Sequence, residues 1–211
     1  CPDQTEPTNQ PRGVSASVKS FQMTPAFSLC VYCASRPGNE PAYTQAAIDT
    51  GHWIGEHGGQ LVYGGGRSGL MGTVAKAALE AGARVVGIIP KVLVDREMAN
   101  TDCTELHVVE TMHERKEMMA TRADAFVALP GGIGTFEEFF EIWTWRQLGY
   151  HNKPVGMLNT AGYYDSMLSF IHHCIQSGLM TESQQNLIQT GTETRPLLAA
   201  LVQESTRLRT D

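Results

Sequence analysis

The sequence predicts an α/β fold: a single domain built on a Rossmann-like, doubly wound parallel sheet with helices on both faces. Three observations predict it. From residue 27 onward short apolar runs alternate with longer stretches of helical spacing, the length of 211 residues suits one domain, and two glycine-rich loops each follow a predicted strand. Such alternation produces right-handed crossovers and therefore a parallel sheet covered by helices on both faces.

The elements are predicted in order along the chain. Residues 1–26 carry four prolines among polar residues and show no periodicity, so we expect a flexible N-terminal arm before a domain of residues 27–211. Short apolar runs predict strands at 27–33, 60–63, 84–89, 105–109, 125–129 and 155–158. Helical spacing predicts helices near 41–57, 69–81, 111–123, 135–148, 163–177 and 195–207.

The composition excludes several classes of function. With 42% hydrophobic and 18% charged residues the chain is expected to fold, and no apolar run reaches the roughly 18 residues of a membrane span. A formal net charge of -6 argues against binding to a nucleic-acid polymer or to an anionic membrane. Because the first 26 residues lack an apolar signal core and the five cysteines are an odd number, we expect a cytoplasmic protein.

The cysteines and histidines do not form an expected metal or redox site. Cys30 and Cys33 make a C-x-x-C pair, but they lie within a predicted strand that points the two thiols to opposite faces. His172 and His173 are adjacent, so on a helix they diverge by about 100°. We therefore expect no metal and no cofactor.

The first glycine loop, Gly64 to Gly69, follows the second predicted strand and formally matches the G-x-G-x-x-G dinucleotide fingerprint. The fingerprint also requires an acidic residue about 20 positions later to bind the ribose, and residues 84–91 contain none. A dinucleotide redox enzyme is thereby disfavoured. Either the loop's backbone approaches an anionic ligand, or its glycines only make a tight turn.

The second glycine loop, residues 129–135, follows the fifth predicted strand and precedes a long helix. Its three glycines supply backbone amides at the positive end of a helix dipole, which favours a phosphate, and Thr135 adds a hydroxyl donor. Alternatively, Thr135 and Glu138 only form a capping box. At about 100° per residue the helix has an aromatic core face and an opposite face suited to a site or subunit contact. The first comprises Phe136, Phe139, Phe140 and Trp143, and the second Glu138, Glu141 and Trp145.

The third cluster, Met112 to Lys116, begins the helix after the fourth strand. A charged helix start exposed to solvent is one interpretation. The other places Arg115 in the same crevice as the glycine loops, since neighbouring strand ends in a parallel sheet lie only about 5 Å apart.

Residues Pro130 to Glu138 match a P-G-G-x-G-T-x-x-E signature. With residues 64–72 and 112–116 they make the chain similar to the Lonely Guy family of cytokinin-activating phosphoribohydrolases, from about residue 27 to 162 and more faintly to 190. The segments beginning at Trp143, Lys153 and Gly162 also match. Members were often labelled lysine decarboxylases, but nothing around the five lysines suggests a pyridoxal site.

This resemblance implies hydrolysis of the N-glycosidic bond of N6-modified adenosine 5′-monophosphates, which releases the free base and ribose 5-phosphate. It implies Arg115 and Glu138 as catalytic residues, with Glu138 acting on the ribose or on the attacking water, and Arg115 on either the departing base or the phosphate. The chemistry agrees, since a carboxylate stabilises positive charge at the anomeric carbon and a cation stabilises the departing base. The implied substrate-binding residues are Glu97, Lys116, Gly131, Gly132, Gly134, Thr135, Glu137, Thr144, Gly65 and Gly66.

The resemblance also implies a homodimer or larger assembly, with residues of two subunits near the site. Relatives of the fold carry the molybdenum cofactor, so a nucleotide-binding or cofactor-carrying protein is the alternative. The chain departs from many relatives at two arginines, Arg36 and Arg67, which lie near predicted strand ends and add positive charge for a phosphate.

Overall fold

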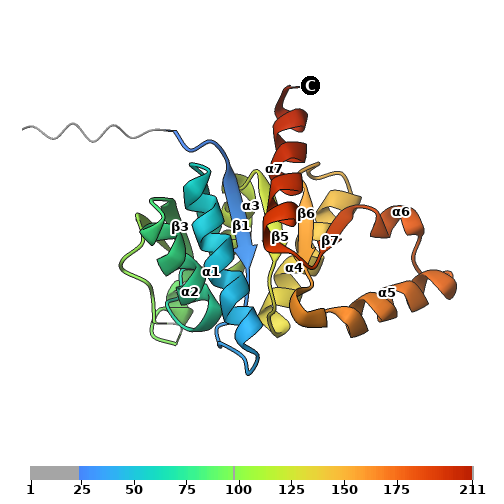
Figure 1. Cartoon of the computed structure of the whole chain (residues 1–211), viewed down its shortest axis with the longest axis horizontal. Helices are drawn as coiled ribbons and strands as arrows, with labels where there is room; N and C mark the ends of the chain where they lie inside the picture. The colour runs from blue at the N-terminus through green and yellow to red at the C-terminus, as the bar shows by residue number, and fades with distance from the viewer. Residues whose placement is uncertain (1–23, 97, 211) are drawn as a thin grey trace, which may run out of the picture.

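The computed structural model describes residues 24–96 and 98–210 and confirms the predicted α/β fold (Figure 1). Within these residues, seven strands form one parallel sheet in the order β4-β3-β2-β1-β5-β6-β7. The strands are β1 Ser28–Tyr32, β2 Gln60–Tyr63, β3 Arg84–Pro90, β4 Glu105–Val109, β5 Ala125–Ala128, β6 Val155–Leu158 and β7 Ile188–Gly191. Most of the predicted arm, residues 1–26, and the predicted site residue Glu97 lie outside the described residues.

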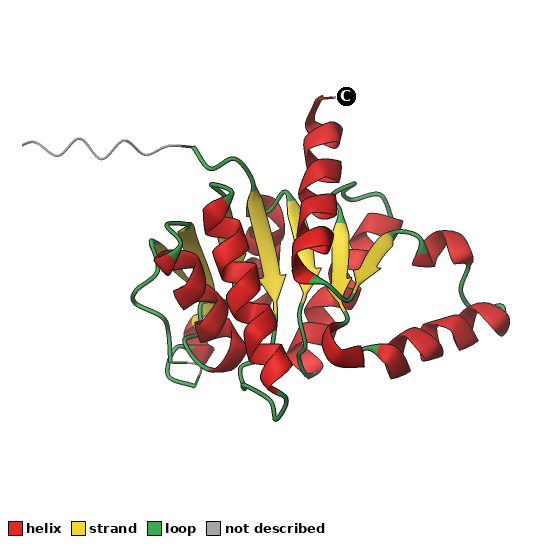
Figure 2. Ribbon diagram, in the orientation of Figure 1, coloured by secondary structure: helices red, strands yellow, loops and turns green. Residues whose placement is uncertain are grey.

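Helices cover both faces of the sheet (Figure 2). The helices are α1 Pro41–Glu56, α2 Gly69–Glu80, α3 Met112–Arg122, α4 Ile133–Gln147, α5 Asp165–Gln176, α6 Glu182–Gln185 and α7 Thr194–Thr210. Side chains of α1, α2 and α7 form the core on one face, and side chains of α3, α4 and α5 form it on the other. None of the helices in the described ranges combines the length and apolar character that a bilayer span requires.

Cys30 in β1 and Cys33 directly after it are divided between these two cores. Cys33 packs with the α1 and α2 side, whereas Cys30 packs with the α3 and α4 side. Both thiols are free and buried. The prediction that the C-x-x-C pair points to opposite faces is confirmed, because residues an odd number apart on a strand face opposite ways.

The order of the strands in the sheet shows where a ligand is expected to bind. The chain runs from β1 outward through β2, β3 and β4, and then returns to the other side of β1 with β5. The loops that leave β1 and β5 therefore turn toward opposite faces at neighbouring strand ends. In open α/β sheets this switch point, at the carboxyl ends of the strands, is where ligands bind.

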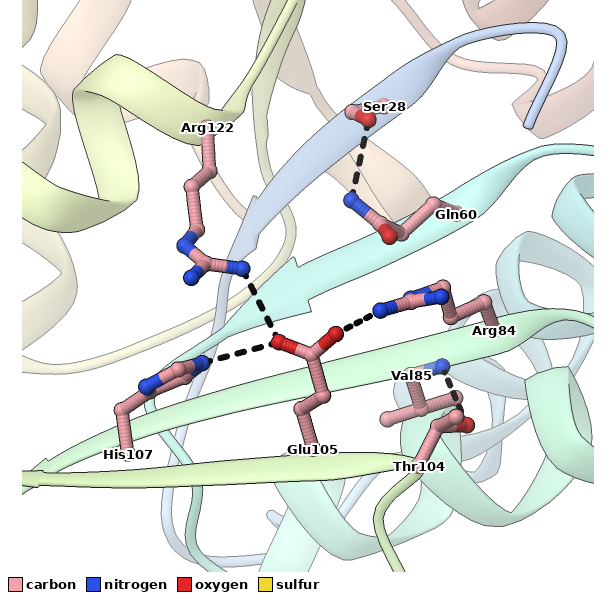
Figure 3. A network of polar contacts seen from close by, with 8 residues as sticks. All are labelled: Ser28, Gln60, Arg84, Val85, Thr104, Glu105, His107 and Arg122. Atoms are coloured by element: carbon pink, nitrogen blue, oxygen red, sulfur yellow. Dashed lines mark hydrogen bonds and ion pairs between the residues drawn. The ribbon is translucent and has the colours of Figure 1, made fainter. Parts of the chain in front are cut away.

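A network around Glu105 holds α3 against the edge of the sheet (Figure 3). The Glu105 carboxylate on β4 makes an ion pair with Arg84 of β3 and accepts a hydrogen bond of 3.0 Å from Arg122 at the end of α3. His107 lies 2.9 Å from the same carboxylate. Burial lowers the pKa of His107 and the charge of Arg122 adds to the effect, so the two guanidinium groups supply the positive charge.

We predict that Glu105→Gln lowers the free energy of unfolding by about 1–2 kcal/mol, because it leaves two arginines without their shared counter-charge. Thermal unfolding measures this change. Glu80→Gln is the control, since Glu80 pairs with Lys76 across 3.8 Å on the exposed side of α2. It should change stability by less than about 0.5 kcal/mol. Equal stability of the two variants would contradict a stabilising role for the Glu105 network.

Candidate active site

A cavity of about 550 Å³ lies at the switch point between β1 and β5. One wall is the loop after β1, residues 33–39, and the opposite wall is the loop that leads from β5 into α4, residues 130–135. Leu70 and Met71 at the start of α2, Tyr43 of α1 and Tyr163 after β6 also line it. The charged side chains of this lining are Arg36, Arg115 and Glu138.

The β5–α4 loop presents backbone amides to this cavity. Helix α4 begins at Ile133, and its N-cap residue is Gly132, which has no side chain to cap the first turn. A Cβ atom added at Gly132 or at Gly134 would meet nothing within 4 Å. The first turn of α4 therefore faces open space, with the positive end of the helix dipole directed at it. We call residues 131–135 the amide loop.

Thr135 lies inside this first turn and does not precede it. The helix starts two residues earlier than the sequence predicts, so the alternative of a capping box between Thr135 and Glu138 is wrong. The side chain of Thr135 is buried and packs against Gly131, where an added Cβ would lie 2.1 Å from Oγ1 of Thr135. Gly131 is thus required for Thr135 to take this position.

Arg115 is a buried arginine held by backbone oxygens. Its side chain is on α3, and only 4% of the residue is exposed. Nε donates a hydrogen bond to the carbonyl of Ile88 at 3.1 Å, and Nη2 donates to the carbonyl of Gly64 at 3.0 Å. These carbonyls belong to β3 and to the loop after β2. The guanidinium is therefore fixed at the carboxyl end of the sheet, and the interpretation of Arg115 as a solvent-exposed helix start is wrong.

Glu138 lines the same cavity from the second turn of α4. Its charge and that of Arg115 both act on the Cys30 thiol of β1. Burial is the main cause that raises the pKa of Cys30, Glu138 raises it further, and Arg115 lowers it. The fold thus brings the two predicted catalytic side chains, which are 23 positions apart in the sequence, to one cavity above β1.

The first glycine loop supports Arg115 and lies outside the cavity lining. A Cβ at Gly64 would lie 2.1 Å from Nη2 of Arg115. Gly65 has a φ of +76°, and its Cα lies 2.9 Å from the position of a Cβ on Gly87 of β3. The predicted substrate-binding residues Gly65 and Gly66 do not line the cavity that contains Arg115 and Glu138. In this loop the glycines make room for a guanidinium and for a neighbouring strand.

The predicted substrate-binding residues Lys116 and Glu137 do not line the first cavity. The Lys116 ammonium pairs with Glu137 and, at 3.0 Å, with Glu141. Burial by itself lowers the pKa of Lys116, but the hydrogen bonds and charges of the two glutamates outweigh it and raise that pKa. Lys116 and Glu141 line a second cavity of about 720 Å³, together with Trp145.

The remaining expectations for α4 are met in part. Phe139 and Trp143 are buried and Phe136 is half-buried, whereas 39% of Phe140 is exposed, so its placement in the core is wrong. The predicted opposite face is divided, since Glu138 lines the first cavity and Trp145 the second. Thr144 is exposed, and its hydroxyl donates to the carbonyl of Phe140 at 2.7 Å. The structure does not bring Thr144 to the first cavity.

Two tyrosines of the cavity wall were not predicted from the sequence. The Tyr163 hydroxyl donates a hydrogen bond of 2.5 Å to the carbonyl of Gly131. Its ring packs edge-on against the ring of Tyr43 on α1, with 5.2 Å between the two ring centres. Tyr163 follows β6, so the rule that ligands bind at the carboxyl ends of strands could have found it. These rings hold the amide loop from the side of α1.

Among residues 24–96 and 98–210 no group of three or more histidine, cysteine, aspartate and glutamate side chains is placed to hold a metal ion. No lysine of the described part of the chain lines the first cavity. Its polar groups are those of an anion site beside a carboxylate and a guanidinium.

A comparison of Gly64→Ala with Gly134→Ala separates the roles of the two loops. We predict that Gly64→Ala displaces the Arg115 guanidinium, and that it lowers both activity and the free energy of unfolding, the latter by about 1–3 kcal/mol. Gly134→Ala should leave stability unchanged or slightly higher, because alanine favours a helix. Its methyl group would occupy part of the open space in front of the amide loop and should weaken binding of an anion there. Calorimetry and thermal unfolding measure both effects, and identical behaviour of the two variants would contradict this division.

Known proteins resemble the chain in sequence and in fold. A family model described as possible lysine decarboxylase matches residues 71–201. The cytokinin riboside 5′-monophosphate phosphoribohydrolase LOG2 of Arabidopsis thaliana is 46% identical over 173 residues, which cover 82% of this chain and 81% of the relative. The enzyme of the same description named LOG, from Oryza sativa subsp. japonica, is 47% identical and covers 82% of this chain and 72% of its own length.

Solved structures share the fold at lower identity. The Moco carrier protein from Chlamydomonas reinhardtii superposes with a TM-score of 0.63 over 88% of this chain and 99% of the carrier, at 20% sequence identity. This likeness shows the fold alone. On the family model and the two relatives, the chain belongs to the Lonely Guy (LOG) family, as the motif at Pro130–Glu138 predicts.

Proposed function

We propose that this protein hydrolyses the N-glycosidic bond of adenosine 5′-monophosphates, including N6-modified ones, and releases the free base and ribose 5-phosphate. The single observation that carries the proposal is the composition of the first cavity. It joins Glu138, Arg115 and the amide loop at the switch point of the sheet. Relatives that are 46% and 47% identical carry the name of this activity, and the matched region includes all three features.

The 5′-phosphate binds at the amide loop in this proposal. The first turn of α4 has no side-chain cap, and Gly132 and Gly134 leave space in front of its amides. A phosphate placed there accepts backbone hydrogen bonds and lies at the positive end of the helix dipole. The ribose then extends toward Glu138, one turn further along α4. Gly131, Gly132, Gly134 and Thr135 are the substrate-binding residues that we retain from the sequence prediction.

Water replaces the base at the anomeric carbon of the ribose. As the bond between that carbon and the base nitrogen breaks, positive charge develops on the sugar and negative charge on the base. The Glu138 carboxylate stabilises the sugar cation and accepts a proton from the attacking water, whose oxygen bonds to the anomeric carbon. The departing base takes up a proton from solvent, and Glu138 returns its own proton to solvent, so that the products are ribose 5-phosphate and the neutral base. Arg115 and Glu138 line the same cavity, which supports a place for Arg115 at the junction of sugar and base. Its rigid attachment to two backbone carbonyls keeps it positioned there without reorganisation.

The test is product formation from a panel of nucleotides. Purified protein is incubated with adenosine 5′-monophosphate (AMP) and with N6-isopentenyl-AMP, and with the corresponding nucleosides as controls, and the products are separated by chromatography. We expect free base together with ribose 5-phosphate from the monophosphates and much slower release from the nucleosides. Release of inorganic phosphate, or no release of base from any monophosphate, would contradict the proposal.

Two other activities are less well supported. A carrier of the molybdenum cofactor has support from the fold alone, since the carrier in the comparison is 20% identical. A pyridoxal-dependent decarboxylase would need a lysine near the reacting atoms, and no lysine lines the first cavity within the described residues. The carboxylate and guanidinium in that cavity favour the glycosidase.

We further propose that the protein is a cytoplasmic homodimer joined through the surface around the second cavity. This surface carries Trp145 and the exposed side chains of Tyr150 and Leu148. Aromatic side chains are enriched at subunit contacts. The free thiols of the described cysteines support a reducing compartment.

Tyr150→Glu tests this interface. Tyr150 is 77% exposed, so the substitution should leave folding intact while it places a charge in an apolar contact. We predict a dimer for the natural chain and a monomer for the variant, measured by light scattering after gel filtration. Phe170→Glu is the control, because Phe170 is 65% exposed on α5, away from the second cavity. A monomeric natural chain, or an unchanged dimer in the Tyr150 variant, would contradict the proposal.

A further inference from the structure

Arg36 is a cation of the first cavity that the mechanism above does not use. It lies in the loop after β1, is exposed, and lines the cavity together with Arg115 and Glu138. Its guanidinium makes no hydrogen bond or ion pair with any other residue of the ranges 24–96 and 98–210. It is therefore available to a ligand, whereas Nε and Nη2 of Arg115 already donate to backbone carbonyls.

The backbone that carries Arg36 is held firmly. The amide of Ala34 donates to the carbonyl of Pro130 at 3.2 Å, so the loop after β1 is bonded to the loop that leads into the amide loop. The carbonyl of Ala34 in turn accepts a hydrogen bond of 3.2 Å from the amide of Met71 on α2. Gly69 has a φ of +58°, and a Cβ there would lie 2.2 Å from the backbone nitrogen of Arg36. The position of Arg36 next to the amide loop is thus built into the fold.

The structure distinguishes Arg36 from Arg67, the other arginine at a predicted strand end. Arg67 does not line the first cavity. It lines a separate cavity of about 250 Å³ with Lys76 and Glu80, and its Nη2 lies 3.9 Å from the sulfur of Met98. Of the two arginines that the sequence singles out, only Arg36 is placed near the amide loop.

We propose that Arg36 binds the 5′-phosphate from the side opposite the amide loop and thereby sets the preference for nucleoside monophosphates over nucleosides. This inference rests on the proposed function for its substrate class. A phosphate carries nearly two negative charges, and the dipole of one helix supplies only about half a positive charge. A guanidinium adds a full charge and a pair of parallel donors that match two phosphate oxygens. Arg36 and the amide loop together offset the negative charge of the phosphate. A nucleoside has no phosphate, so neither feature adds to its affinity.

The test compares AMP with adenosine by calorimetric titration. The full chain with Glu138→Gln is the parent, since this change should slow turnover about 10²–10³-fold while AMP is titrated. Added to it are Arg36→Ala, Arg36→Lys and, as the control, Arg67→Ala. We expect Arg36→Ala to weaken AMP binding about tenfold to a hundredfold and to leave adenosine binding within about twofold. Arg36→Lys should lie between the parent and the alanine variant, because it keeps the charge but loses the paired donors. Arg67→Ala should match the parent.

Three outcomes would overturn the assignment of Arg36. They are an AMP affinity within about twofold of the parent in Arg36→Ala, an equal loss of affinity for AMP and adenosine, and the same loss in Arg67→Ala. None of these depends on catalysis. If the natural chain releases base from AMP while Arg36→Ala binds AMP normally, the proposed function stands and the role of Arg36 fails. If the natural chain releases no base but Arg36→Ala loses affinity for AMP and not for adenosine, the role of Arg36 stands and the proposed function fails.

Discussion

Glu138→Gln is expected to lower kcat for AMP hydrolysis by about 10²–10³-fold, the effect of removing one preorganised group that stabilises transition-state charge. Glutamine has nearly the same shape as glutamate but carries no negative charge for the sugar cation and cannot accept a proton from water. KM should change only a few-fold, because the phosphate is bound by the amide loop and not by this carboxylate. Steady-state kinetics with chromatographic detection of adenine measures both constants.

Two further variants support the interpretation of that result. Glu138→Asp keeps the charge but moves it back along the side chain, so we expect activity between the natural chain and Glu138→Gln. Glu80→Gln, on the exposed side of α2, should retain full activity. Thermal unfolding verifies that each variant is folded. A folded Glu138→Gln protein with natural activity would show that this carboxylate is not the catalytic group.

Arg115→Ala is expected to reduce both activity and stability. The side chain is buried and donates to the carbonyls of Ile88 and Gly64, so its loss leaves two backbone acceptors unsatisfied. Each hydrogen bond from a charged donor contributes about 1.5–3 kcal/mol, and we predict a loss of about 3 kcal/mol in the free energy of unfolding. Activity should fall by about 10²-fold or more, because the cation beside the departing base is absent.

Chemical rescue separates the two effects of Arg115. The alanine variant leaves a space lined by the carbonyls that held the guanidinium, so millimolar guanidinium chloride should restore part of the activity. Arg115→Lys keeps a charge but cannot reproduce the fixed planar contacts, and we expect at least a tenfold loss of activity. An Arg115→Ala protein with natural activity and stability would contradict both roles.

The fold was predictable because most of its elements carry a strong sequence signal. All six predicted strands and all six predicted helices are present. The strand β7 and the short helix α6 were missed. The strand β7 is Ile-Gln-Thr-Gly at the sheet edge, where only Ile188 is buried, so neither an apolar run nor clear alternation marks it. Helix α6 has four polar residues, too few for any periodicity.

The site was predictable where a rule about strand ends applied. That rule brings Arg115 and the second glycine loop to one crevice, although only the folded chain shows that Arg115 is buried beneath the first glycine loop. Helical spacing alone failed for Phe140, since the faces of α4 depend on where α3 and α5 pack. The sequence also grouped Arg36 with Arg67. Their separation follows from the hydrogen bond of Ala34, near Arg36, to Pro130 and from the contact of Arg67 with Met98.

The most direct test of the central claim is a crystal structure of the Glu138→Gln variant with AMP bound. It should show the phosphate on the amides of residues 132–135, with the anomeric carbon of the ribose within about 3.5 Å of the residue 138 side chain and Arg115 beside the bond to the base. A nucleotide bound in the second cavity, or one bound in the first cavity with its phosphate at Arg115 and its sugar remote from residue 138, would contradict the account.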